Sequence, residues 1–199
     1  MGQHGRDLVT ACPERLLGSL GTMTEPFRTA TGCLLHAGWT YEPPTSSGDG
    51  APFPLRTAPD TVIRWVSSFS LLANADETVW FLSRDDYSTG AAGAFAWNEY
   101  EQLSLQAATT DDEAAAISRF WTRHLPLLLS VRNGYEYLAV RDDGAVVHGA
   151  EPEFEEAVVV FSHFEDLLTH IISWPARLDH VIDGLLFDSI SIPDARPGH

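Results

Sequence analysis

The chain has 199 residues, of which 44% are hydrophobic and 11% aromatic, and this length and composition predict one packed domain and not a disordered chain. Its 28 acidic and 12 basic residues give a formal net charge of −16, which disfavours nucleic acid and anionic membranes as partners. The same charge favours a basic protein as partner, although solubility alone is an alternative reason for it.

The two cysteines, Cys12 and Cys33, both belong to the amino-terminal part of the chain. We expect them to be free thiols, because two cysteines pair only in an oxidising compartment. The first residues lack the apolar core of a signal peptide, and no apolar run approaches the roughly 18 residues that span a bilayer. These features predict a cytoplasmic protein.

Residues 1–58 are expected to contribute a helical region and a long loop. A cap at Thr22 or Thr24 precedes apolar residues that recur at helical spacing, and Gly38 would end that helix. Residues 43–59 are rich in Pro, Gly and Ser and therefore predict a loop. Because this region is too small to fold alone, we assign it to the same domain as the rest of the chain.

Helices and one strand are expected in the next part of the chain. Asp60 is the expected cap of a helix, and residues 77–83 are rich in β-formers, which predicts a strand. Residues 91–97 are a candidate for a short edge strand. Two further helices are expected to start at Asn98 and Thr110, because each is followed three residues later by a glutamate, as in a capping box.

The stretch from residue 127 to residue 161 predicts a meander of antiparallel strands. Asn133-Gly134 and Asp143-Gly144 are strong signals for tight hairpin turns between strands. The expected strands are residues 127–131, 135–141, 145–148 and 157–161.

The order of these elements predicts the fold class. Ser162 begins another capping box before an apolar stripe, and Pro175 begins a final helix. We therefore predict an α+β fold: a single domain with a central, mainly antiparallel sheet that is partly wrapped by helices. Residues 59–192 form its core, and residues 193–199 are expected to be a flexible tail.

The acidic run at residues 151–156 has two interpretations. Glu153 and Glu155 point the same way on an extended chain, so with His148 they are the candidate residues of a carboxylate-dependent, metal-assisted hydrolase. The other interpretation is a solvated loop with Phe154 tucked into the core. We favour the loop, because no calcium-binding pattern is present.

Other signs of catalysis or of a cofactor are weak. His163 and His170 share an expected helix but are seven residues apart, whereas zinc-binding pairs on a helix are usually three or four apart. The sequence has no Gly-x-Ser-x-Gly elbow and no phosphate-binding Gly-Lys-Ser/Thr motif. We therefore expect a protein that is not an enzyme and that has no metal or other cofactor.

Several short motifs resemble the SUKH superfamily, whose members include bacterial immunity proteins against toxins and fungal cell-wall regulators. Together they cover about residues 60–173. The motifs are WFLS at 80–83, DY at 86–87, WNEYE at 97–101, FW at 120–121, HLP at 124–126, GYEY at 134–137, GAEPEFE at 149–155 and SHFEDLL at 162–168. The resemblance implies an α+β fold with no catalytic residues and a function in binding, often of a toxin enzyme.

The charge and the resemblance together predict an immunity-type protein that binds and neutralises a basic toxin domain. The alternative within the same fold is a regulatory or scaffolding protein, which the adjacent genes would distinguish. We expect the partner to contact acids in the predicted loops, since they can face a basic surface. These candidate contact residues are Asp85, Asp86, Asp142, Asp143, Glu151, Glu153 and Glu155.

Overall fold

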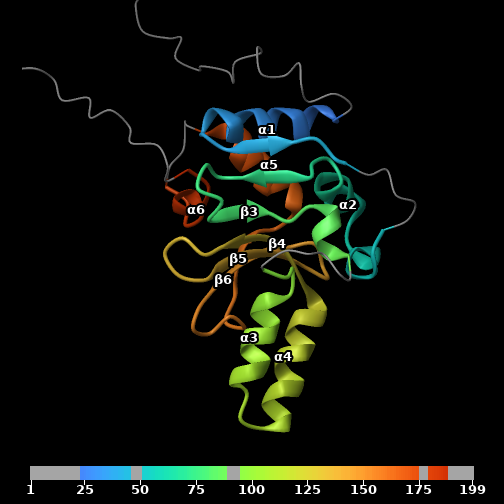
Figure 1. Ribbon diagram of the computed structural model, residues 1–199, viewed down its shortest axis with the longest axis vertical. Helices are drawn as coiled ribbons and strands as arrows, with labels where there is room; N and C mark the ends of the chain where they lie inside the picture. The colour runs from blue at the N-terminus through green and yellow to red at the C-terminus, as the bar shows by residue number, and fades with distance from the viewer. Residues whose placement is uncertain (1–22, 46–50, 89–94, 175–178, 188–199) are drawn as a thin grey trace, which may run out of the picture.

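A computed structural model describes residues 23–45, 51–88, 95–174 and 179–187 (Figure 1). Its centre is one seven-stranded sheet in which every neighbouring pair is antiparallel and the strand order follows the chain. The α+β prediction is therefore confirmed. The strands are β1 (Thr40–Glu42), β2 (Leu71–Ala73), β3 (Val79–Phe81), β4 (His124–Ser130), β5 (Glu136–Arg141), β6 (Val146–Ala150) and β7 (Val158–Phe161).

The predicted meander corresponds to β4–β7. Gly134 and Gly144 have φ of 123° and 90°, a backbone region that favours glycine, and both lie in the turns predicted from the sequence. Strand β4 begins at His124, three residues before the predicted start, and its register shifts between Pro126 and Leu128. Proline has no N–H to donate to the ladder, so a bulge is a position where a strand tolerates it.

One face of the sheet is covered by three helices. Helices α1 and α5 pack against each other, and α2 packs against α5. Trp65 is fully buried among them, and the rings of Phe27, Phe69, Phe81 and Phe164 lie 5.4 to 6.1 Å from its ring. The three helices are α1 (Glu25–His36), α2 (Asp60–Val66) and α5 (Phe164–Ser173).

The opposite face carries buried tyrosines. Alternate residues of a strand point to opposite faces, so Trp80 lies on this face while Phe81 packs beside Trp65. Tyr100 and Tyr137 are fully buried here, and each hydroxyl donates to a backbone carbonyl, of Ser130 and Phe154 respectively. These bonds satisfy polar groups that would otherwise be costly to bury.

A helical hairpin projects from this part of the sheet (Figure 1). It consists of α3 (Glu99–Ala107) and α4 (Asp111–Arg123), which are inserted between β3 and β4. The predicted cap at Thr110 is confirmed, because its hydroxyl accepts from the backbone N–H of Glu113 at 3.2 Å. Asn98 precedes α3 as predicted, although its side chain makes no capping bond to the helix backbone.

Other predictions were displaced or incomplete. The cap of α2 is Pro59, one residue before the cap predicted at Asp60, and the cap of α5 is His163, one residue after the cap predicted at Ser162. Strands β1 and β2 were missed, as were the 3-10 helices η2 (Phe53–Thr57) and η3 (Arg84–Tyr87). The expected tail at 193–199 lies outside the described residues, and so do residues 91–94 of the expected edge strand at 91–97. The final helix is described only as α6 (Asp183–Phe187).

Cys33 lies on the buried face of α1 and is disulfide-bonded, so the prediction of a free thiol is wrong for this residue. Cys12 lies outside the described residues. None of the described helices is both long and apolar enough to span a bilayer.

A matched pair of glycine substitutions tests the packing of the tyrosine face. A Cβ at Gly149 would lie 2.5 Å from the ring of buried Tyr137, so we expect Gly149→Ala to destabilise the fold by about 1–3 kcal/mol. Gly184→Ala in α6 meets nothing within 4 Å and should change stability by less than about 0.5 kcal/mol. Urea unfolding measures both, and equal effects would contradict the packing described.

Candidate functional site

The seven predicted contact acids do not form one surface patch. Asp142 and Asp143 follow β5, whereas the run from Glu151 to Glu155 follows β6, and the two groups are at opposite ends of that strand. Strand β6 has five residues, which span roughly 16 Å at about 3.3 Å per residue. Asp85 and Asp86 belong to η3, in a third location.

Two of these acids hydrogen-bond to partly buried groups of the protein itself. Asp86 accepts from the backbone N–H of Ser83 at 2.7 Å and from its hydroxyl at 2.8 Å, which caps η3. Desolvation raises the pKa of Asp86. Glu155 accepts from the indole Nε1–H of Trp121 at 2.7 Å and so ties the loop after β6 to α4. Both carboxylates therefore have structural roles.

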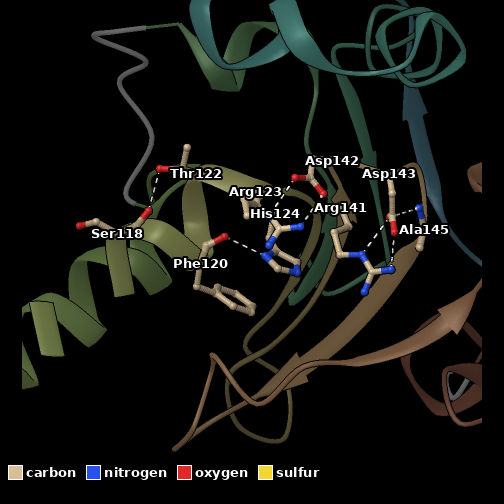
Figure 2. A network of polar contacts seen from close by, with 9 residues as sticks. All are labelled: Ser118, Phe120, Thr122, Arg123, His124, Arg141, Asp142, Asp143 and Ala145. Atoms are coloured by element: carbon tan, nitrogen blue, oxygen red, sulfur yellow. Dashed lines mark hydrogen bonds and ion pairs between the residues drawn. The ribbon is translucent and has the colours of Figure 1, made fainter. Parts of the chain in front are cut away.

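Asp142 and Asp143 are paired with arginines at the end of the helical hairpin (Figure 2). Arg123 donates from Nε and Nη2 to Asp142 at 2.7 and 3.3 Å, and these bonds lower the pKa of Asp142. Arg141 donates from Nε to Asp143 at 2.8 Å and also pairs through Nη2. The bonds from Arg141 lower the pKa of Asp143 to about 2.

The three remaining acids are exposed. Asp85 accepts from the hydroxyl of Thr45 at 3.3 Å. Glu151 and Glu153 form no ion pair with any described residue. Glu151 and Glu153 are therefore the predicted contact residues that remain the best candidates for contacting a partner.

The residues of the hydrolase hypothesis do not come together. His148 contacts Glu136 through Nε2 at 3.0 Å, while Glu155 is bonded to Trp121. Gly149 lies against the ring of Tyr137, which packs on Trp121, so Gly149 is on the same face of the sheet as Trp121 and its partner Glu155. Successive residues of a strand point to opposite faces, and His148 therefore points away from Glu155. Within the described chain, no three His, Cys, Asp or Glu side chains form a group that suits a metal ion.

His163 and His170, which the sequence placed on one helix without favouring a metal site, have separate partners. His163 precedes α5, and its backbone N–H donates to Asp166 at 3.0 Å. His170 instead contacts Asp183 at 2.6 Å, and both side chains are 10% exposed. His180 lies 4.8 Å from His170 between ring centroids, so this cluster joins α5 to the segment that leads into α6.

A cavity of about 380 Å³ lies where η2 and the end of the hairpin meet the sheet. This volume is in the range of small-molecule sites. The sequence analysis missed it, because its walls come from four segments that are remote in the chain. Its apolar walls are Phe53, Trp97, Trp121, Leu125 and Val140, and its charged residues are Arg56, Glu101, Arg123, Arg141 and Asp142.

The end of α4 lies beside the cavity, which Trp121, Thr122 and Arg123 line. His124 follows Arg123 and stacks on Phe120 with ring centroids 3.8 Å apart (Figure 2). Its Nδ1 lies 2.7 Å from the carbonyl of Phe120, which can only accept, so Nδ1 carries the proton. Burial lowers the pKa of His124. Glu101 lines the cavity, and burial raises the pKa of its carboxyl group.

No protein-family model, curated protein or solved structure matches this chain. The resemblance to the SUKH superfamily therefore stays a prediction.

The lowered pKa of His124 predicts an effect of pH on stability. Below the unfolded pKa of about 6.5, the unfolded imidazole binds a proton more readily than the folded one, so stability falls as the pH decreases. His124→Gln should therefore lose less stability between pH 7 and pH 5 than the parent protein. Urea midpoints at both pH values measure this, with His36→Gln at an exposed position as control. An unchanged loss in His124→Gln would contradict the prediction.

Proposed function

We propose that this chain is a non-catalytic protein-binding module of the immunity type, which binds and neutralises a basic toxin domain. The observation that carries the proposal is a set of exposed carboxylates that no described cation neutralises. Glu151, Glu153 and Glu156 are exposed in the loop after β6, and none of them forms an ion pair with a described residue. Asp111 and Asp112, at the start of α4, are also exposed and also form no ion pair with a described residue.

Exposed carboxylates would favour binding of a basic protein through long-range electrostatic attraction. Several arginines are already engaged within the protein: Arg123 and Arg141 pair with acids, and Arg132 donates to Leu185 O at 3.2 Å. The net charge of −16 is therefore concentrated in carboxylates that are open to solvent. Such a field attracts a basic protein and raises its association rate, with a strong dependence on salt.

The cytoplasmic location remains part of this proposal. The disulfide of Cys33 favours an oxidising compartment instead, since cytosolic thiols are kept reduced. Trapping thiols in intact cells before lysis decides between the two locations. An oxidised Cys33 in the cell would overturn the location and leave the binding proposal untouched.

Neutralising the acids of the β6–β7 loop tests the binding proposal. We expect Glu151→Gln/Glu153→Gln/Glu156→Gln to slow association with the toxin domain encoded by the adjacent gene by about tenfold at low salt, because steering depends on local charge. Stopped-flow or biosensor kinetics measure the rate. The difference should shrink at 1 M salt, where screening is nearly complete.

The control variant is Glu42→Gln/Asp76→Asn/Glu77→Gln, which removes the same charge from exposed acids at the β1–β3 side of the sheet. An equal loss in the control would mean that total charge, and not this loop, attracts the partner. Carbodiimide cross-linking gives a second readout, because the chain contains no lysine and every lysine cross-link must come from the partner. The proposal fails if the adjacent toxin neither binds nor loses toxicity.

A further inference from the structure

The cavity beside η2 is lined by aromatic side chains and by more arginines than acids, although the chain as a whole is strongly acidic. Phe53, Trp97 and Trp121 contribute ring surfaces to its walls, and Leu125 and Val140 contribute aliphatic surface. Phe53 is 81% exposed, although large apolar side chains normally lie inside a protein. The walls therefore suit an apolar body of one or two rings.

Three arginines line the same cavity: Arg56, Arg123 and Arg141. Only two acids, Glu101 and Asp142, line it with them, so the wall carries one positive charge more than negative in a chain of net charge −16. The lining is thus not acidic, in contrast to the chain as a whole, although Asp143, which lies outside the lining, pairs with Arg141.

The arginines retain donors for a ligand. Arg123 and Arg141 use Nε and Nη2 for Asp142 and Asp143, and these pairs fix the orientation of both guanidinium groups (Figure 2). A guanidinium has five N–H donors, and the Nη1 groups of both arginines donate to no other described residue. Arg56 donates from Nε to the carbonyl of Ala51 at 3.3 Å, which is a neutral acceptor.

We propose that this cavity binds a small amphipathic carboxylate, with its apolar body against the aromatic walls and its carboxylate against the arginines. Charge-assisted bonds from arginine to carboxylate are stronger than neutral ones, so the charged group contributes affinity as well as orientation. This site is independent of the acidic loop proposed to contact a protein partner.

Paired ligands test the proposal. Naphthalene-1-acetate carries the expected charge, and naphthalene-1-acetamide has the same body without it. We expect calorimetry on the whole chain to show the carboxylate binding at least about tenfold more tightly than the amide, as expected for one charge-assisted bond. Millimolar concentrations of both ligands without detectable binding would overturn the proposal, as would equal affinities.

Two variants with one control assign the interaction to the cavity. Arg56→Gln should reduce the affinity for the carboxylate by about tenfold and leave the amide unchanged, because only the charge is removed. Phe53→Ala, at a position too exposed to support the core, should weaken both ligands. The control is Arg64→Gln, at an arginine of α2 that does not line the cavity and whose Nε donates to the carbonyl of Asp60. A loss in Arg64→Gln equal to that in Arg56→Gln would place the anion elsewhere.

Discussion

The tyrosine face depends on the placement of Tyr137. Its ring packs 5.0 Å from Trp121 of α4, and its hydroxyl donates to the carbonyl of Phe154 in the loop after β6. Glycine at position 149 leaves the space that the ring needs. One side chain therefore joins the sheet, the hairpin and the acidic loop. Because the hydroxyl is buried and bonded, its burial raises the pKa of Tyr137, and the group stays a neutral donor.

This arrangement connects the two features on which the proposals rest, the cavity and the acidic loop. Trp121 forms a wall of the cavity and also donates to Glu155, so the loop that carries Glu151 and Glu153 is tied to the hairpin. Arg123, Arg141 and Asp142 line the cavity, whereas Glu151 and Glu153 of the loop are exposed and form no ion pair with a described residue. One surface is therefore suited to a cationic protein and the other to a small anion.

The sequence predicted the elements whose signals are local. The turns at Gly134 and Gly144 and the cap at Thr110 each depend on a few neighbouring residues, and all three were found in the expected places. Strands β1 and β2 have three residues each and form only through their pairing partners, so no local pattern reveals them.

The candidate site was harder to predict for the same reason. Asp142 binds an arginine 19 residues away, and Glu155 binds a tryptophan 34 residues away. A carboxylate that has such a partner cannot be distinguished by sequence from one that faces solvent. The cavity combines residues from Phe53 to Asp142 and has no sequence motif of its own.

The binding proposal requires that the acidic loop after β6 contacts a basic protein. Amide hydrogen exchange of the chain, measured alone and with a basic toxin domain as candidate partner, locates this contact. We predict slower exchange on binding in residues 151–157 and in the first turn of α4, with no change in β1 and β2. Protection confined to β1 and β2, or no protection at all, would contradict the account.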